Sequence, residues 1–289
     1  MVAEIGSEIR IRDASKGLLD WAREELILPN PQYRERERRG LWVGNTPKYL
    51  WLYRVDGSDL VVPTGVGKQV RQFLSKQDEI IVQLADNGIL EYQGNIPLYD
   101  YQKAAVEALK KSSCGILQSP CGSGKTQMGI ALAAALGRKT LWVTHTQDLL
   151  TQSKARAEQY FPEENLGTIT AGKVRIGSHV TFATVQTLSK LDLTQYRNTW
   201  DVVIVDECHR LAGSPTQVTM FYKVMNNLAA RYKYGLSATV HRSDGMIKST
   251  FAVLGPIIYR VPDEAVADKT MQVRIVPRDT GIAVSRGCL

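Results

Sequence analysis

The stretch "GILQSPCGSGKTQMGIALAAALG", residues 115 to 137, is the strongest structural signal in the chain. Its first residues, "GILQ", are typical of a short buried strand; the glycine-rich loop "SPCGSG" follows, and the alanine-rich remainder predicts a helix that ends at Gly137. A loop between a strand and a helix directs backbone N–H groups and the helix N-terminus at one point, where phosphate binds. Lys125 can then reach the β- and γ-phosphates of a nucleotide, and the Thr126 hydroxyl can ligate Mg²⁺. The stretch therefore predicts a site for a nucleoside triphosphate and Mg²⁺.

A second stretch, "VVPTGVGKQV" at residues 61 to 70, looks similar but lacks the essential chemistry. Gln69 follows Lys68, so the small hydroxyl of a metal-binding loop is missing. We expect a turn from strand to helix, in which Gly65 and Gly67 serve the backbone geometry. Lys68 would face solvent or contact a DNA phosphate.

A pair of acids provides the second half of the nucleotide site. In "WDVVIVDECH", residues 200 to 209, an apolar strand ends at Asp206 and Glu207. Asp206 is expected to hold Mg²⁺, and Glu207 to orient or deprotonate the attacking water. With Lys125, these are the predicted catalytic residues. The alternative, a charged cap after a buried strand, explains two adjacent acids less well.

Strands and helices alternate along most of the chain. From residue 94 onward, apolar strands alternate with helices of ordinary length, which predicts an α/β fold with a parallel sheet covered on both faces. The first 93 residues predict a smaller α+β module, with a helix at 16 to 28 and a hairpin around Asp56-Gly57. Turn-forming residues in "YQGNIPLYD" place the boundary between domains 1–93 and 94–262.

Composition narrows the class of protein. Of 289 residues, 44% are apolar and 22% are charged, which is typical of a globular protein with a core. We expect a cytoplasmic protein, or one of the host cytoplasm if a phage encodes it, because no secretion signal or membrane-spanning run is evident. The four cysteines are too widely spaced to suggest zinc. Residues 94 to 289 carry 23 Lys/Arg against 15 Asp/Glu, which suits a polyanionic partner.

These motifs together resemble the first RecA-like motor domain of a superfamily 2 helicase, over about residues 96 to 260. "SPCGSGKT" resembles motif I, "DECH" motif II of the DEAD/DEAH type, and "LSAT" motif III; "LYDYQ" resembles the adenine-recognition element. The resemblance implies ATP and Mg²⁺ as cofactors. The implied ATP-binding residues are Gln102, Ser119, Pro120, Cys121, Gly122, Ser123, Gly124, Lys125 and Thr126. The implied residues that couple the nucleotide state to movement are His209, Ser237, Ala238 and Thr239.

Two further segments are similar to nucleic-acid-binding motifs of this family. "VTHTQDLLTQ" resembles motif Ia and "FATVQTL" resembles motif Ib. The resemblance implies backbone contacts from Thr144, Thr184, Gln186 and Thr187, whose polar side chains suit phosphate. Ordinary strand-end and helix-cap chemistry is the alternative for each.

The segment "LSATVHRSDG", residues 236 to 245, is similar to the "LSATPxRxDG" of one helicase branch, with Val240 in place of proline. That branch contains transcription-repair helicases, phage recombination helicases and type III restriction subunits. It implies an ATP-dependent DNA helicase or translocase, although RNA is not excluded as the nucleic acid. We expect the protein to act as a monomer and not to bind a membrane. Two alternatives stay open: a non-catalytic half-motor that binds nucleic acid or a partner, and the motor subunit of a restriction complex.

The resemblance also implies a second RecA-like domain that supplies arginine fingers, which can contribute about 10³- to 10⁵-fold in turnover. Residues 263 to 289 are expected to be a linker or the start of that domain. Without it, the chain is expected to bind ATP–Mg²⁺ weakly and hydrolyse it poorly.

Aromatic residues stand out in the first module. Trp42, Trp51 and Tyr53 could form a platform for bases, although aromatic residues at such spacing are more typical of a core. The charged run "RERERR", residues 34 to 39, is more typical of a solvated surface than of a nucleic-acid contact. DNA binding by residues 1–93 is therefore one of two open interpretations.

Overall fold

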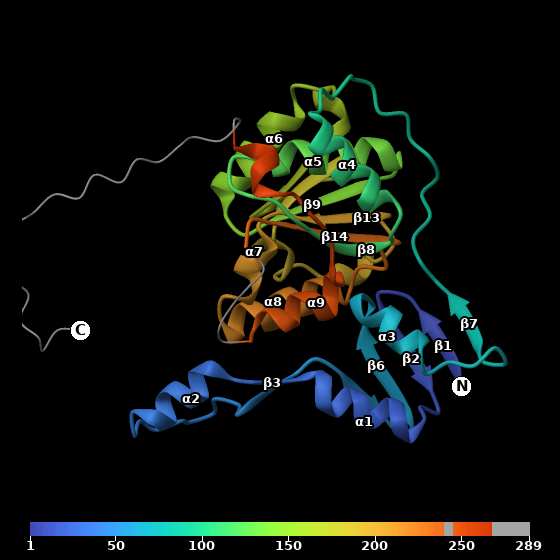
Figure 1. Cartoon of the computed structure of the whole chain (residues 1–289), viewed down its shortest axis with the longest axis vertical. Coiled ribbons are helices and arrows are strands. Elements are labelled where there is room, and N and C mark those ends of the chain that lie inside the picture. The colour runs from blue at the N-terminus through green and yellow to red at the C-terminus, as the bar shows by residue number, and fades with distance from the viewer. Residues whose placement is uncertain (240–244, 268–289) are drawn as a thin grey trace, which may run out of the picture.

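The computed structural model describes residues 1–239 and 245–267. Within this part an eight-stranded sheet forms the centre of the larger domain, which we call the motor domain (Figure 1). Its strand order is β11-β10-β12-β9-β13-β14-β8-β15, and neighbours are parallel except at the edge, where β11 is antiparallel to β10. The strands are β8 (Cys114–Gln118), β9 (Thr140–Thr144), β10 (Leu166–Thr170), β11 (Lys173–Arg175), β12 (Val180–Thr184), β13 (Val202–Val205), β14 (Tyr232–Ser237) and β15 (Ile257–Arg260).

Helices cover both faces of this sheet (Figure 1). One group is α4 (Asp100–Lys110), α5 (Lys125–Leu136) and α6 (Gln147–Ala157); the other is α7 (Val185–Leu188), α8 (Pro215–Met225) and α9 (Ile247–Leu254). In β13 the side chains of Val202 and Ile204 enter the core beneath the first group, and those of Val203 and Val205 enter the core beneath the second. Because both faces are buried, β13 is continuously apolar. The predicted α/β fold with a parallel sheet is confirmed.

The first part of the chain, which we call the module, is built on a five-stranded sheet of order β5-β6-β2-β1-β7. Its elements are β1 (Val2–Ile5), β2 (Glu8–Arg12), α1 (Lys16–Glu25), β5 (Arg54–Asp56), β6 (Asp59–Pro63), α3 (Gly67–Arg71) and β7 (Glu79–Val82). The predicted hairpin joins β5 and β6, with Asp56 opposite Asp59. The look-alike loop is a turn from strand to helix, as predicted, and Lys68 is exposed.

A separate ribbon projects from the module, and we call it the arm (residues 27–53). It consists of β3 (Ile27–Pro29), α2 (Pro31–Arg38) and β4 (Tyr49–Trp51), and β3 pairs with β4. The predicted helix at 16 to 28 ends earlier than expected, because its last residues form β3. The charged run forms α2, which begins where the Asn30 side chain accepts a hydrogen bond from the Gln32 N–H.

The module and the motor domain share one hydrophobic cluster. Ile9, Leu18 and Leu60 of the module pack in the same cluster as Val218 and Met246 of the motor domain. The approach is close at Gly65, where an added Cβ would lie 2.5 Å from the Gly255 nitrogen and 2.6 Å from the Ala252 carbonyl oxygen. The buried ammonium of Lys233 donates to the carbonyls of Ser7 and Met225, both at 3.1 Å. The two parts are therefore joined by apolar packing and hydrogen bonds.

The segment between them, residues 83–98, is bonded to the motor domain. The Ala85 N–H donates to the Ala229 carbonyl at 2.8 Å, and the Leu90 N–H donates to the Gly137 carbonyl at 2.8 Å. The module's sheet ends at Val82. The predicted boundary after residue 93 thus falls within a segment that packs against the motor domain. Of the predicted linker 263–289, Asp263–Val266 forms a 3₁₀ turn, and 268–289 lie outside the described residues. Among the described residues, no helix combines the length and the apolar character needed to cross a membrane.

Candidate nucleotide site

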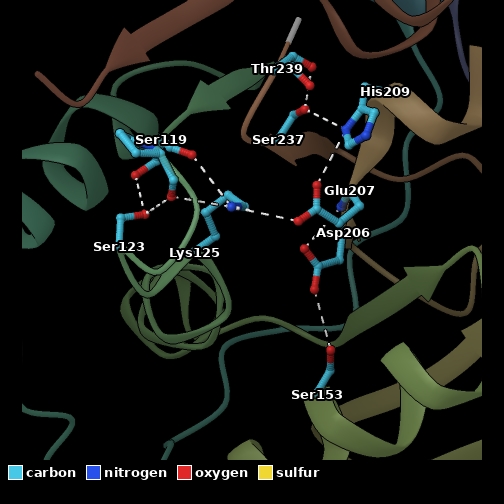
Figure 2. Close-up of polar contacts among 10 residues, drawn as sticks. Ser119, Ser123, Lys125, Ser153, Asp206, Glu207, His209, Ser237 and Thr239 are labelled. Atoms are coloured by element: carbon cyan, nitrogen blue, oxygen red, sulfur yellow. Dashed lines mark hydrogen bonds and ion pairs between the residues drawn. The ribbon is translucent and has the colours of Figure 1, made fainter. Parts of the chain in front are cut away.

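The predicted nucleotide-binding residues meet at one edge of the motor sheet. Strands β13, β14 and β8 are neighbours and parallel, so their carboxyl ends lie together. The loop after β8, the acids after β13 and Ser237 at the end of β14 therefore converge (Figure 2). A cavity of about 730 Å³ opens here, a size that suits a nucleotide. Its lining includes Pro97, Leu98, Tyr99, Gln102, Gly122, Gly124, Lys125, Thr126, Gln127, Leu149, Gln152, Ser153, Arg156, Asp206 and Glu207.

Hydrogen bonds hold the loop in shape. Gly124 has a φ of 81° and precedes α5, a left-handed conformation that favours glycine. The Ser119 hydroxyl donates to the Ser123 hydroxyl at 2.5 Å, and the Ser123 hydroxyl donates to the Pro120 carbonyl at 2.7 Å. The Gln102 amide donates to the Ser123 carbonyl at 2.9 Å. The loop is thus fixed from within and from α4.

Four of the eight predicted loop residues line the cavity: Gly122, Gly124, Lys125 and Thr126. Ser119 and Ser123 are buried. Their hydroxyls are used in the loop's own hydrogen bonds, so they shape the loop. Cys121 is exposed and, like Pro120, does not line the cavity.

Lys125 lies between the loop and the acids (Figure 2). Its side chain is only 8% exposed. Its Nζ lies 3.4 Å from the Pro120 carbonyl oxygen and 3.6 Å from Glu207 Oε1. A positive charge is therefore held where the phosphates of a nucleotide would enter.

Asp206 is a buried carboxylate on the opposite wall. Its Oδ1 accepts a hydrogen bond from the Glu207 N–H at 3.0 Å, and its Oδ2 accepts one from the Ser153 hydroxyl at 3.4 Å. Burial raises its pKa to about 6, and the charge of Glu207 adds to the effect. A divalent cation would offset this cost, because it favours the ionised carboxylate.

The donor set suits Mg²⁺. The carboxylate of Asp206 and the hydroxyl of Thr126 both line the cavity and offer the oxygen ligands that Mg²⁺ prefers. The described residues contain no cluster of three His, Cys, Asp or Glu side chains. Mg²⁺ bound with substrate phosphates needs only one or two protein ligands, so the residues present fit this ion.

Glu207 connects the loop to β14. It has a φ of 48°, an uncommon conformation for a residue other than glycine and one that clusters at functional sites. Its Oε2 lies 3.3 Å from His209 Nδ1, which in turn lies 2.8 Å from the Ser237 hydroxyl. That hydroxyl donates to the Thr239 carbonyl at 2.7 Å. Polar contacts therefore run from Lys125 through Glu207 and His209 to Thr239 (Figure 2).

Several lining residues were not predicted from the sequence. Leu149, Gln152, Ser153 and Arg156 lie on one face of α6. Their helical spacing was available in the sequence, but it is indistinguishable from an ordinary amphipathic face. Tyr99 stands in the quoted motif "LYDYQ"; its ring stacks on that of Tyr101, with centroids 5.8 Å apart.

The four residues predicted to contact nucleic acid differ in how far they are buried. Thr144 is fully buried, and its hydroxyl donates to the Thr146 carbonyl at 3.0 Å. Thr184 is buried and caps α7 by accepting from the Thr187 N–H at 3.2 Å. Both hydroxyls therefore make the strand-end and helix-cap hydrogen bonds that were the alternative to contacts with nucleic acid. Gln186 and Thr187 are partly exposed on α7.

Comparisons with known proteins cover the part of the chain that holds this cavity. The family model described as "Type III restriction enzyme, res subunit" matches residues 95–242. The chain is 32% identical over 203 residues to the "DNA 3'-5' translocase XPB2" of Sulfurisphaera tokodaii, covering 69% of this chain and 44% of that protein. It is 28% identical to the "DNA 3'-5' helicase XPB" of Mycobacterium tuberculosis, covering 72% and 40%. The chain thus spans less than half the length of these relatives.

A solved structure shares the fold. The UvsW helicase from bacteriophage T4 superposes with a TM-score of 0.62 at 20% sequence identity, over 90% of this chain and 100% of that chain. At this identity the likeness concerns the fold alone. It includes the module as well as the motor domain, because 90% coverage exceeds what the motor domain could provide.

Proposed function

This chain belongs to the family of type III restriction enzyme res subunits within the superfamily 2 helicases, and on that premise we propose that it is the ATP-binding part of a DNA translocase. The observation that carries the proposal is the convergence of Lys125, Thr126, Asp206 and Glu207 on one cavity. The printed names of the relatives, DNA 3'-5' translocase and helicase, favour DNA over RNA.

The phosphates of ATP would bind between the loop and the acids. Lys125 would exchange its contact with Glu207 for the β- and γ-phosphates, which leaves the Glu207 carboxylate available to a water. Thr126 and Asp206 would hold Mg²⁺, which, when bound, neutralises charge that develops on the phosphates. Glu207 would accept the proton of the attacking water.

Gln102 is suited to recognise adenine while it holds the loop. Its amide donates to the Ser123 carbonyl, and its Oε1 accepts from the Tyr99 N–H at 3.0 Å. Its Oε1 keeps one acceptor lone pair, and Gln102 lines the cavity. An acceptor at this position would suit the amino group of adenine.

The contacts from Glu207 to Thr239 support a role in coupling. Loss of the γ-phosphate changes what Glu207 contacts, and His209 and Ser237 connect Glu207 to the segment Ser237-Ala238-Thr239. We propose that this segment transmits the nucleotide state toward the nucleic acid. Residues 240–244, which complete the branch pattern, lie outside the described residues.

The nucleic-acid contacts and the second domain remain proposals. Gln186 and Thr187 of α7 would contact a strand backbone, whereas Thr144 and Thr184 would support that surface from beneath it. A second RecA-like domain of the intact protein would supply arginine to the γ-phosphate. The monomeric state and the cytoplasmic location stay predictions.

A Glu207→Gln change tests the assignment of the base. We expect ATP to bind with unchanged affinity, whereas DNA-stimulated phosphate release in the intact protein falls about 10²- to 10⁴-fold, the usual contribution of a general base. Isothermal titration and a phosphate-release assay measure the two effects. Turnover at the wild-type rate would show that another group takes the proton.

Two lysines provide a matched control for the loop assignment. Lys125→Ala should abolish ATP binding, whereas Lys68→Ala in the look-alike loop should leave it unchanged. The reverse result would move the nucleotide site to the module.

The family description favours a second candidate, the motor of a restriction complex. In that case ATP-dependent movement of the intact protein would serve DNA cleavage by a nuclease domain or subunit. Cleavage of a long duplex that depends on ATP and is lost with Glu207→Gln would favour this candidate; strand displacement without cleavage would favour a helicase.

A further inference from the structure

The arm exposes aromatic side chains that belong to no core. In β4 and the residues after it, Leu50 and Leu52 point into the shared cluster and are 8% and 2% exposed. The alternate residues point the other way: Tyr49 is 44% exposed and Trp51 is 58% exposed. Tyr53 follows β4 and is partly buried, because it packs against the shared cluster; its ring lies 5.7 Å from that of Trp51. We call Tyr49 and Trp51 the aromatic row. For Trp51, the interpretation as a core residue is wrong.

Trp42, in the loop between α2 and β4, is more exposed still, at 84%. Its indole lies against the backbone of Gly44, where an added Cβ would be 3.0 Å from the ring. Its carbonyl accepts a hydrogen bond from Arg36 at 3.4 Å. One face of the ring is therefore supported by the protein while most of the side chain is open to solvent.

Positive charge is concentrated around these rings. Residues 27 to 53 carry five Lys/Arg and two Asp/Glu, whereas the rest of residues 1 to 93 carries eight and twelve. The Lys48 ammonium lies 6.0 Å and 5.9 Å from the ring centres of Tyr33 and Tyr49. Figure 1 shows the arm extending away from the module's sheet, with α2 at its far end. The arm is thus a basic and aromatic projection from an otherwise acidic module.

This combination identifies the partner by its chemistry. Positive charge selects a polyanion, and exposed aromatic faces stack on bases that have no neighbour of their own. Alternate residues of a strand are about 6.6 to 6.8 Å apart, roughly twice the 3.4 Å between stacked base pairs. The row therefore matches bases of an extended single strand and not those of a stacked duplex. A second copy of the chain is disfavoured, because two such arms would bring like charges together.

We propose that the arm is a binding surface for unpaired bases, with Trp42 and Trp51 as its main stacking residues. The proposal deepens the proposed function, since it names a single-stranded or frayed segment as the part of the DNA that the module binds. The motor domain would contact the strand backbone, and the arm would contact bases.

A thermodynamic cycle between protein and DNA tests this proposal. The full chain, without ATP, is titrated against a single-stranded oligothymidine, an abasic strand with the same number of phosphates, and a blunt duplex of equal length. We expect the wild type to bind the base-containing strand more tightly than the abasic one, by about tenfold for each stacked base. Trp42→Ala with Trp51→Ala should lose that preference and bind the abasic strand as the wild type does.

Conservative and remote variants serve as controls. Trp42→Phe with Trp51→Phe keeps the aromatic faces and should retain most of the preference. Ile89→Ala, which alters a residue 80% exposed outside the arm, should change nothing. Both indoles are exposed, so thermal melting should show the variants folded.

Three outcomes would overturn the proposal: equal loss of affinity for base-containing and abasic strands, no loss at all, or equal preference for the duplex. No loss together with altered sedimentation would assign the surface to association between copies or with another protein. Because the titration needs no ATP, a failure of the ATPase assignment leaves its result intact. Likewise, Glu207→Gln reports on the motor domain whether or not the arm binds bases.

Discussion

Gly65 allows the close approach of the module to α9. The backbone atoms of Ala252 and Gly255 occupy the space that a Cβ at this position would need. Gly67, two residues later in the same loop, meets only the end of the Ile9 side chain, at 3.3 Å. The two glycines of the look-alike loop therefore have different tolerances, although the sequence presents them alike.

Substitutions at Gly65 and Gly67 should show which of the two positions cannot accommodate a Cβ. Gly65→Ala is expected to lower the free energy of unfolding by about 1–3 kcal/mol, the usual cost of overpacking, because the opposing atoms are backbone and cannot rotate away. Gly67→Ala, the matched control, should have little effect, since Gly67 is helical and Ile9 can change rotamer. Urea unfolding measures both. Equal effects would show that the contact at Gly65 relaxes.

Lys233 makes stability depend on pH. Burial lowers its pKa from the ordinary 10.5 to about 7, against smaller opposing effects of Glu8 and Cys114; Arg197 lowers it further. Between pH 7 and 10 the unfolded chain holds a proton that the folded protein has released. Raising the pH through this interval therefore favours the folded state.

The change of the free energy of unfolding with pH measures the contribution of Lys233. The free energy of unfolding should rise from pH 7 toward pH 10, with a contribution from Lys233 of at most about 1.4 kcal/mol per pH unit. Lys233→Met should remove that contribution, whereas Lys76→Met, at an exposed position, should not. Parallel pH curves for the wild type and Lys233→Met would mean that the buried amine keeps its proton.

For single residues, the sequence largely predicted which chemical groups form the site, but it did not predict how far each residue is buried or what it contacts. Lys125, Thr126, Asp206 and Glu207 were found because phosphate and Mg²⁺ demand particular groups at fixed spacing after buried strands. Thr144 and Thr184 have equally suitable hydroxyls, but the sequence does not reveal that the first is fully buried and the second caps α7. Trp42 was ambiguous for the same reason, because hydrophobic residues are not always buried.

Helices and strands that each follow one regular hydrophobic pattern were predicted from the sequence. Where a single pattern is split between two elements, the sequence did not predict the split. The strand β13 and the helix α5 each follow one pattern throughout. The run "KYLWLYRV" alternates as a single strand would, yet it forms β4, which pairs with β3, and β5, which pairs with β6. Pairing partners distant in sequence decide such a division, so alternation alone does not indicate it. The arm exists because of this division.

For the whole molecule, the shared cluster predicts that module and motor domain unfold together. Val218→Ala, in α8, removes methyl groups from a cluster that includes Leu60 of β6. It should cost about 2 kcal/mol and shift the urea midpoints of β6 and β13 equally, as followed by hydrogen exchange. Val174→Ala, on the exposed side of β11, should shift neither. Separate midpoints for the two strands would indicate two independent folding units.

The contact between Gly65 and α9 also bears on how the protein would occupy DNA. A module that shares a core with the motor domain is expected to move with it, so the arm would keep a constant distance from α7 when the nucleotide changes. Suppose that the arm and α7 both bind the same DNA strand. The edge of the DNA footprint that the arm protects would then stay at a fixed distance from the nucleotides that α7 contacts. Changes of nucleotide would then lengthen or shorten the protected region from the opposite edge alone.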